Sequence, residues 1–473
     1  MAGTTSDDRY DLVVIGGGSA GLTAAGFAAG IGARVLIVAE QLGGDCTWTG
    51  CIPSKALIRA ARQVRDAHVA ASSGIAAGEI RVDFARVMTE VRAAIDRVYA
   101  FETPELLATR GTELVIGTAR FADRETVDVG QRRFQARRFI ICTGAAASVP
   151  AISGLDKVAY RTYETLWRSE RLPTSMVVVG AGATGLELAQ AFVRLGSKVT
   201  VLEERASVLP EADPDATAII LRRLESEGIE FHLSSAASSV SPIGGGVEVR
   251  AGAERIESES LLIATGRRPR LDGLNLDQAG VEVRDGAIRV NKNLRTTNPI
   301  VYAAGDVTGG FQFTHYAGWQ GYVAARNALL PGAQEGIRRK IPWAVFTDPE
   351  IAQAGLTESE ARKDFGDVKV HRIELDRVDR AQTEGEREGF LKLVTRPDWK
   401  LVGATVVSKV AGETIDELAL AIDRGLTLSD LASTIHAYPT FGFAIQQLAA
   451  EASFEAAATG IRGQAVRALR RLS

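Results

Sequence analysis

The feature that most constrains the fold is a pattern of strand, glycine loop, helix and strand that occurs twice in the chain. Residues 10–40 read YDLVVIGGGSAGLTAAGFAAGIGARVLIVAE, and residues 175–204 read SMVVVGAGATGLELAQAFVRLGSKVTVLEE. In each copy an apolar run leads into a G-x-G-x-x-G loop, and a helix-like stretch then leads into a second apolar run. One such loop is weak evidence, but two copies in the same context predict two dinucleotide-binding βαβ units.

The glycines of such a loop allow a tight turn and let the backbone approach a pyrophosphate, while the helix that follows supplies unpaired N–H groups. The alternative is that the glycines serve only to pack the strand on the helix. Because both copies repeat the whole pattern, we favour the cofactor-binding interpretation. The candidate residues are Gly16, Gly18 and Gly21 in the first copy, and Gly180, Gly182 and Gly185 in the second.

An acidic residue at the end of the second strand normally hydrogen-bonds a ribose diol. In the second copy it is Glu203, 18 residues after Gly185, whereas the 18th residue after Gly21 is Ala39 and Glu40 follows it. Either the first strand ends one residue later than expected or the first copy holds its ribose less directly. We predict Glu40 as the ribose contact.

Two dinucleotide sites in one chain suggest a flavoenzyme, with FAD at one site and the reducing nicotinamide at the other. At the second site, the Glu203 carboxylate suits a free 2′-hydroxyl and repels a 2′-phosphate, which favours NADH. Arg205 lies close by in the sequence and keeps NADPH open.

Three further segments read as strands that end near a cofactor. RFIICTGA (138–145) and SLLIATGRRPR (260–270) end in the glycine turns of Gly144 and Gly266, where we expect the chain to cross between domains. NPIVYAAGDV (298–307) ends at Asp306, which would place a carboxylate at a strand end. An alternative for Asp306 is a helix N-cap, and both interpretations can hold together.

The segment GGDCTWTGCIPSK (43–55) contains Cys46 and Cys51, two of only three cysteines in the chain. In a straight helix their Cα atoms would lie roughly 8–9 Å apart, and a disulfide needs about 7 Å or less. Pairing therefore requires an irregular turn, which Gly50 permits. Pro53 suits the first turn of a helix. The helix N-terminus and Lys55 would then lower the pKa of the Cys51 thiol.

A structural disulfide, half of a metal site and a redox-active pair are all compatible with this spacing. We predict no metal site, because Cys142 lies in an apolar strand and no histidine cluster accompanies the pair. Beside two dinucleotide sites, the redox-active interpretation is preferred.

The totals narrow the class of protein. A chain of 473 residues predicts two to four domains. A net charge of −3 with interspersed signs gives no support for nucleic-acid or membrane binding. The start, MAGTTSDDRY, does not resemble a signal peptide, and no run reaches the ~18 apolar residues of a membrane span. We therefore expect a cytoplasmic protein.

The sequence pattern changes near residue 341, where strand-like and helix-like runs continue without a glycine-rich loop. The runs GFLKLVT and LVGATVV read as strands, and TIDELALAIDRG and FAIQQLAAEASF read as helices. Because this part has no glycine-rich phosphate loop, we predict an interface domain. The tail GIRGQAVRALRRLS is basic and is expected to form a solvated helix.

The chain resembles the pyridine nucleotide–disulfide oxidoreductases, which include dihydrolipoamide dehydrogenase, glutathione reductase and mercuric reductase. The resemblance rests on GGGSAG, GGDCTWTGCIPSK, GAGATGLE, ATGRRP, YAAGDV and FTDPEIA in family order. It implies an α/β fold with two Rossmann-like domains, which bind FAD and NAD(P), and a C-terminal α+β dimerisation domain. The implied bounds are 1–150 with 271–340 for FAD, 151–270 for NAD(P), and 341–473 for dimerisation. A homodimer would complete each active site from the partner subunit.

The resemblance also implies roles for individual residues. Cys51 would be the flavin-facing thiolate that forms a charge-transfer complex, and Cys46 would be the interchange thiol that attacks substrate. Lys55 would pair with Glu187 near the flavin N5 atom, and Asp306 would hold the ribityl chain of FAD.

One departure from the family bears on substrate. Several relatives carry a His-Pro-Thr segment, in which the histidine is the acid–base and a glutamate orients it. Here the segment is IHAYPTFGFAIQQLAAE, with Tyr438 in the place of the histidine and Phe443 in that of the glutamate. His436, two residues earlier, is an alternative base. Tyr438 and the small Ala183 look closer to the mercuric reductase branch, although the last cysteine is Cys142 and no C-terminal cysteine pair is present.

The sequence thus predicts an FAD-dependent NAD(P)H oxidoreductase that passes electrons through Cys46 and Cys51 to a small disulfide or a soft metal ion. A quinone-like acceptor reduced directly by flavin is also open. The alternatives are a dihydrolipoamide dehydrogenase and a redox-sensing flavoprotein with little turnover.

Overall fold

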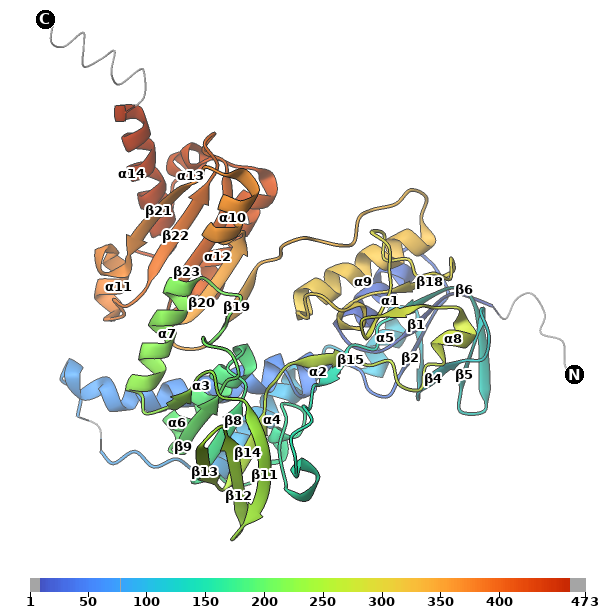
Figure 1. The fold of residues 1–473 in the computed structure, drawn as a ribbon. Helices are drawn as coiled ribbons and strands as arrows, with labels where there is room; N and C mark the ends of the chain where they lie inside the picture. Colours follow the sequence, from blue (N-terminus) through green and yellow to red (C-terminus); the bar gives the residue numbers. More distant parts are fainter. Residues whose placement is uncertain (1–8, 77, 460–473) are drawn as a thin grey trace, which may run out of the picture. The chain divides into compact units, whose positions relative to one another are not determined.

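The computed structural model describes residues 9–76 and 78–459, which Figure 1 shows as a coloured ribbon. The predictions for residues 1–8 and for the basic tail 460–473 lie outside these residues. The chain forms two compact units, one of residues 1–204 and 235–339 and the other of residues 205–234 and 340–473. Residues 205–234 fall within the stretch predicted to bind NAD(P), and they pack with the C-terminal residues.

The first βαβ pattern folds as predicted, from β1 (Tyr10–Ile15) through α1 (Ser19–Gly30) to β2 (Val35–Ala39). Strand β1 lies between β2 and β6 and is parallel to both. The sheet continues through β3 beyond β2, through β18 beside β6, and through the antiparallel strands β5 and β4. The bounds of these strands are β3 Thr112–Ile116, β4 Ala119–Phe121, β5 Thr126–Val129, β6 Arg132–Ile141 and β18 Val301–Ala303.

Side chains alternate between the two faces of β1, as the period of a strand requires. Leu12 and Val14 pack in a core with α1 and α9 (Thr314–Leu329), whereas Val13 packs in a second core on the other face. Both faces are apolar because this sheet is covered on each side. Helices α1 and α9 approach closely, since a Cβ at Gly321 would overlap the Ala20 carbonyl.

The second βαβ pattern forms β8 (Ser175–Val179), α6 (Ala183–Leu195) and β9 (Lys198–Leu202). Strand β8 lies between β9 and β14 (Ser260–Ile263) and is parallel to both. Helix α3 (Cys51–Val69) packs against α6 and against α4 (Phe84–Tyr99). Strands β11 (Ala237–Ile243), β12 (Gly246–Ala251) and β13 (Glu254–Ser258) form an antiparallel sheet whose apolar residues share a core with β8 and β14.

A two-stranded sheet links the regions that follow the two parallel sheets. Strands β7 (Ala145–Ala147) and β15 (Arg267–Pro269) pair in antiparallel fashion. They begin just after Gly144 and Gly266, whose positive φ angles of 71° and 118° suit glycine. The other short elements of this unit are α2 Gly44–Trp48, η1 Ala70–Ser73, α5 Pro104–Thr109, η2 Leu155–Lys157, η3 Leu166–Arg168, α8 Leu276–Ala279, β16 Val283–Arg284, β17 Ala287–Ile288 and η4 Asp306–Thr308.

The C-terminal unit is built on a five-stranded antiparallel sheet in the order β19-β20-β23-β22-β21. Residues of α12, α13 and α14 pack on it to form one core. This arrangement is the predicted α+β domain. Its elements are α7 Pro214–Ser226, β10 Glu230–His232, β19 Trp343–Val345, β20 Glu350–Gly355, α10 Glu358–Phe365, β21 Lys369–Glu374, η5 Leu375–Arg377, α11 Asp379–Glu384, β22 Phe390–Thr395, β23 Leu401–Ser408, α12 Ala411–Arg424, α13 Leu428–Ser433 and α14 Phe443–Thr459.

A buried ion cluster joins the start of α7 to β22. The Lys392 ammonium lies 2.9 Å from Asp213 Oδ2 and 2.6 Å from Asp215 Oδ2, and the side chains of Lys392 and Asp213 are 5% and 2% exposed. Burying a charge without a partner is costly. The ionic contacts therefore tie the start of α7 to the C-terminal sheet.

In residues 9–76 and 78–459, no helix is long and apolar enough to cross a membrane.

We predict that Lys392→Met lowers the free energy of unfolding by about 3–5 kcal/mol, because it leaves Asp213 buried without its cation. Denaturant titration of the C-terminal unit's transition measures the effect. The exposed Lys400 offers a control, and Lys400→Met should change stability by less than about 0.5 kcal/mol. Equal effects of the two substitutions would contradict the importance of the cluster.

The second glycine loop yields a paired prediction. A Cβ at Gly185 would overlap the Gly180 carbonyl, whereas a Cβ at Gly182 would meet nothing within 4 Å. Gly185→Ala should therefore lower stability by about 1–3 kcal/mol, and Gly182→Ala should leave thermal stability near wild type while weakening NADH binding. Calorimetric unfolding and nucleotide titration measure the two effects. Loss of stability in Gly182→Ala would refute this assignment.

Candidate active site

The predicted cysteine pair lies at a break between two helices. Cys46 belongs to α2 and Cys51 opens α3, with Gly50 between them at φ −109° and ψ −105°. This is the irregular turn that pairing requires, and Pro53 occupies the first turn of α3 as expected. Both cysteines are free thiols in the structure.

The two thiols differ in acidity. The pKa of Cys51 is lowered by its hydrogen bond with Cys46, by the Thr314 hydroxyl 3.3 Å away, and by the positive charges of Lys55 and Arg267. The same thiol–thiol hydrogen bond, together with burial, raises the pKa of Cys46. The arrangement therefore favours a thiolate at Cys51 that accepts a hydrogen bond from a neutral thiol at Cys46.

A half-buried ion pair lies beside the cysteines. Lys55 Nζ of α3 donates to Glu187 Oε2 of α6 over 2.8 Å, and the Glu187 side chain is only 6% exposed. Because α3 carries both Cys51 and Lys55, the pair connects the redox segment to the helix that follows the second glycine loop. This is the pairing that the resemblance implies, and its position next to a flavin stays a prediction.

The first glycine loop has the shape that a dinucleotide needs. Gly16 adopts φ +116°, and a Cβ at Gly21 would overlap its carbonyl oxygen. Gly18 begins the 12-residue helix α1, whose first N–H groups receive no side-chain cap. A Cβ at Gly18 would come no closer than 3.6 Å to any atom of the chain, so the backbone there is open to a phosphate.

The second loop repeats the geometry. Gly180 has φ +109°, Gly185 packs against it, and Gly182 begins the 13-residue helix α6 without a side-chain cap. The space around Gly182 is open. Both loops therefore fit the pyrophosphate of a dinucleotide, with FAD expected at the first and NAD(P)H at the second.

The structure settles where the two acidic residues stand. Strand β2 ends at Ala39, one residue later than expected, so Glu40 directly follows its strand as Glu203 follows β9. Glu40 Oε1 accepts a hydrogen bond from Thr118 at 2.7 Å, and Glu203 Oε2 accepts one from the Ala181 N–H at 2.7 Å. Their contacts with ribose stay predictions.

Asp306 lies in an arginine-rich polar cluster. It is the first residue of η4, and Gly305 is the N-cap, so the N-cap alternative for Asp306 is wrong. Burial raises the pKa of Asp306, while Arg267, whose Nη1 lies 3.2 Å from Asp306 Oδ2, opposes that shift. The Arg267 guanidinium also lies 4.5 Å from the centroid of the Tyr163 ring.

Tyr438 and His436 belong to the C-terminal unit. The exposed Tyr438 donates its hydroxyl proton to Asp379 Oδ2 over 2.7 Å, and this bond raises its pKa. His436 Nε2 lies 2.7 Å from Glu417 Oε1, and its Nδ1 lies 2.9 Å from the Thr434 carbonyl oxygen. Both ring nitrogens are thus engaged within the domain, which favours a structural role for His436.

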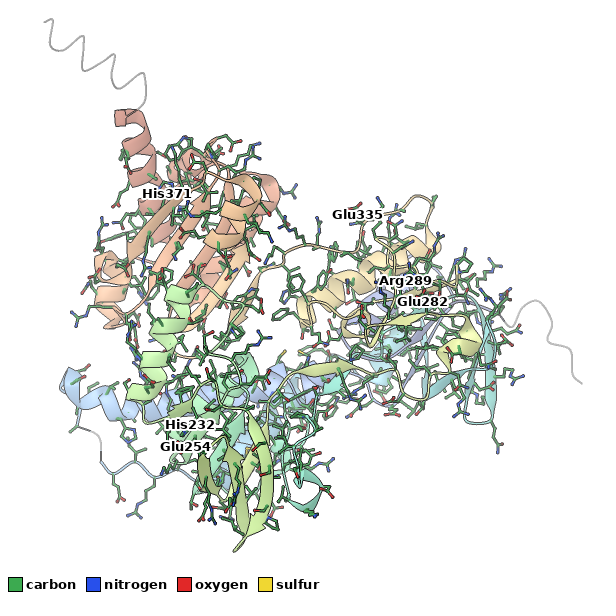
Figure 2. All side chains as sticks on the ribbon, viewed as in Figure 1. His232, Glu254, Glu282, Arg289, Glu335 and His371 are labelled. Carbon is green, nitrogen blue, oxygen red and sulfur yellow. The ribbon has the colours of Figure 1, made fainter. Side chains whose placement is uncertain are left out.

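The remaining histidines offer no metal centre. His371 lies on β21 (Figure 2), where it stacks on Trp399, and burial lowers its pKa. His232, also labelled in Figure 2, bonds to Glu230 at 2.9 Å. Among residues 9–76 and 78–459, no three His, Cys, Asp or Glu side chains gather closely enough to hold a metal ion.

Four residues around the cysteines were not identified from the sequence. Thr314 follows a loop with no recognisable motif, and it is separated from Cys51 by 263 residues. Arg267 lies inside the segment ATGRRP, in which the glycine is the recognisable feature. Asp45 and Tyr163 are ordinary residue types whose contact appears only in three dimensions.

Comparison with known proteins identifies the family. A family model described as pyridine nucleotide-disulphide oxidoreductase matches residues 10–321, and the model of its dimerisation domain matches residues 341–449. The chain belongs to this family. It is an NAD(P)H-dependent flavoprotein disulfide oxidoreductase with an FAD/NAD(P)-binding α/β fold and a C-terminal dimerisation domain.

Relatives of two activities are equally similar to the chain. A mercuric reductase of Lysinibacillus sphaericus is 36% identical over 447 residues, covering 92% of this chain and 81% of that protein. A dihydrolipoyl dehydrogenase of Thermus scotoductus is 36% identical over 449 residues, covering 93% and 96%. The solved Cu(II) complex of the HOCl-induced flavoprotein disulfide reductase RclA from Escherichia coli has TM-score 0.84 and 28% identity, covering 92% of this chain and 99% of that one.

The acidity of Cys51 is open to a direct test. Because its pKa is lowered, the thiolate persists as pH falls below the range of ordinary thiols and is lost only at the lowered pKa. Thr314→Val should move the alkylation midpoint of Cys51 upward by about one pH unit, since a hydrogen bond to a charged group contributes about 1.5–3 kcal/mol. Iodoacetamide labelling of the reduced protein, followed by peptide mass spectrometry, gives the profile. An unshifted midpoint would exclude Thr314 as a donor to the thiolate.

Proposed function

We propose that this flavoprotein uses NADH to reduce the Cys46–Cys51 disulfide and that the dithiol then reduces a small disulfide or a soft metal ion, in the manner of a mercuric reductase. The observation that carries the proposal is the unequal acidity of the two adjacent thiols. Only Cys51 is set up as a thiolate, which leaves Cys46 as the thiol offered to an acceptor. An unequal pair of this kind suits exchange chemistry better than a static cross-link.

The chain's own residues supply the setting for electron transfer. Bound FAD would carry electrons from the nicotinamide to the cysteines, held by Gly16, Gly18 and Gly21 with Asp306 at the ribityl chain. Lys55 brings a positive charge to the same helix turn as the Cys51 thiolate, and Glu187 fixes the Lys55 ammonium at 2.8 Å. Cys46, whose thiol donates to Cys51, gives up its proton when it attacks an acceptor.

The C-terminal segment favours a small or metallic acceptor. Exchange with a large disulfide benefits from a general acid that protonates the leaving thiolate. Tyr438, which stands where several relatives have a histidine, commits its proton to Asp379 and has a raised pKa. His436 has no free ring nitrogen in its own domain. A soft metal ion needs thiolates rather than a general acid.

The similarity to known proteins supports the same class of acceptor. Mercuric reductases are among the relatives that are 36% identical, and the RclA structure was solved as a Cu(II) complex. Two thiols on adjacent helix ends can present sulfur to one soft ion. We therefore place Hg(II)-like and Cu(II)-like ions first among the acceptors, ahead of a quinone-like molecule.

The choice of nicotinamide rests on Glu203. Its carboxylate directly follows β9 and accepts the Ala181 N–H, so a ribose at this position would meet an anion. A 2′-phosphate would be repelled, which favours NADH over NADPH, although Arg205 lies two residues on.

The dimerisation domain supports a homodimer. We propose that the Tyr438 segment of one subunit completes the cysteine site of the other. We also propose a cytoplasmic location, where the reducing environment keeps a catalytic pair available.

The main alternative is dihydrolipoyl dehydrogenase activity, because a relative with that activity is also 36% identical. It would require a base other than the missing histidine and glutamate pair. A redox sensor with little turnover is a second alternative, and it predicts flavin reduction by NADH without rapid reoxidation by any acceptor.

An acceptor screen tests the proposal. With NADH, wild-type protein should reduce Hg(II), Cu(II) or a small disulfide faster than it exchanges lipoamide with NAD⁺. Cys46→Ser and Cys51→Ser should each lower metal-ion or disulfide reduction by roughly 10³-fold, because the two thiols act as one unit. Tyr438→Phe should keep most of the metal-ion activity. Activity that survives in both cysteine variants would refute the dithiol route, and rapid lipoamide turnover would favour the alternative.

A further inference from the structure

The helix that carries Cys46 is too short to be stable by itself. Helix α2 spans five residues, and isolated helices of that length are unstable in water. Its position therefore depends on side-chain contacts. Thr47 Oγ1 donates to Glu102 Oε2 over 2.8 Å, and Trp48 Nε1 donates to the Leu42 carbonyl over 2.6 Å. These two bonds tie the second half of the helix to its surroundings.

Two aromatic residues from a single segment also contact α2. The Tyr163 hydroxyl donates to Asp45 Oδ2 over 3.1 Å, at the start of α2. Trp167 Nε1 shares its N–H between the Thr49 carbonyl at the end of α2, at 2.7 Å, and the Tyr163 carbonyl, at 2.6 Å. Tyr163 and Trp167 are only 5% and 7% exposed, so these bonds are shielded from water. Asp45 also accepts from Arg270 over 3.2 Å, which keeps its carboxylate oriented.

The ring of Tyr163 has a second contact. The guanidinium of Arg267 lies over it, 4.5 Å from the ring centroid, in a cation–π geometry. Arg267 Nη1 also bonds Asp306 at 3.2 Å. Arg267 also lies next to the cysteine segment, since a Cβ at Gly50 would meet its Nη2 at 3.6 Å. Its positive charge helps to lower the pKa of Cys51, although less than the bonds from Cys46 and Thr314 and the charge of Lys55 do. Tyr163 thus makes two contacts. Its hydroxyl bonds the helix that carries Cys46, and its ring packs against Arg267, the cation that favours a thiolate at Cys51.

We propose that Tyr163 is a positioning residue for the redox pair: its hydroxyl fixes the helix that carries Cys46, and its ring holds Arg267 where its charge favours a thiolate at Cys51. The inference rests on Cys46 and Cys51 being the redox-active pair of the proposed function. It assigns the hydroxyl of Tyr163 to the support of Cys46 and the ring of Tyr163 to the support of Cys51. Tyr163 touches neither thiol itself, so it acts through Asp45 and Arg267.

Two substitutions separate the role of the Tyr163 hydroxyl from that of its ring. Tyr163→Phe removes the hydroxyl bond to Asp45 but keeps the ring, whereas Tyr163→Leu removes both. Losing the Asp45 bond loosens α2 and weakens the hydrogen bond that Cys46 gives to Cys51. Losing the ring also releases Arg267. The alkylation midpoint of Cys51 in the reduced holoenzyme should rise from wild type to Tyr163→Phe and further to Tyr163→Leu, reaching about one pH unit.

The equilibrium of the dithiol with glutathione redox buffers gives a second readout. Because a stabilised thiolate favours the reduced form, both variants should become more strongly reducing than wild type. The exposed Tyr160, three residues away, is the matched control, and Tyr160→Phe should leave both readouts unchanged.

The outcome that overturns the proposal is a folded, FAD-containing Tyr163→Phe and Tyr163→Leu pair with wild-type alkylation profiles, even at reduced thermal stability. If Tyr163→Leu does not fold, Tyr163→Phe alone carries the test, and its alkylation midpoint must still lie above that of the wild type. Neither readout uses an acceptor. Failure of the proposed acceptor chemistry would therefore leave this test intact and distinguishable.

Discussion

The active arrangement depends on one hydrogen bond, from the thiol of Cys46 to the sulfur of Cys51. It exists because the chain breaks its helix at Gly50, which brings two residues five apart in sequence into contact at adjoining helix ends. A continuous helix would hold the sulfurs apart. The bond makes one sulfur an anion and the other a proton donor, and the surrounding charges reinforce this difference rather than create it.

The two G-x-G-x-x-G loops also depend on a few local backbone contacts. Each begins with a glycine at positive φ, and a third glycine packs against that first glycine's carbonyl. In each, the middle glycine is the N-cap of a helix without a side-chain cap; the space around Gly182 is open, and a Cβ at Gly18 would meet the Gly44 Cα at 3.6 Å. The two outer glycines of each loop thus pack against one another, and we expect the middle one to approach the nucleotide. The repeated pattern therefore carries information on both the packing of the loop and the access of a ligand to it. This is why it predicts the βαβ fold well.

Much of this was predictable because the determinants are local. The βαβ units, the helix start at Cys51 and the α+β C-terminal part follow from apolar period, glycine spacing and the proline. The shift of β2 by one residue was left open, because strand ends depend on pairing with neighbours. The alternative interpretation of Asp306 as an N-cap was wrong because Gly305 takes that place. Thr314, Arg267 and Tyr163 could not be found, since their importance lies in contacts across more than a hundred residues of sequence.

The buried ion cluster of the C-terminal unit has a consequence for how this protein is made. Asp213 and its cation, Lys392, are separated by 179 residues. During synthesis the segment that carries α7 emerges well before the sheet that neutralises its carboxylate. Helix α7 cannot make this ionic contact until β22 has also been synthesised, and contacts between residues so far apart in sequence form slowly. The synthesis of Lys392 thereby sets the earliest point at which the Asp213 carboxylate, at the start of α7, can pair with its cation.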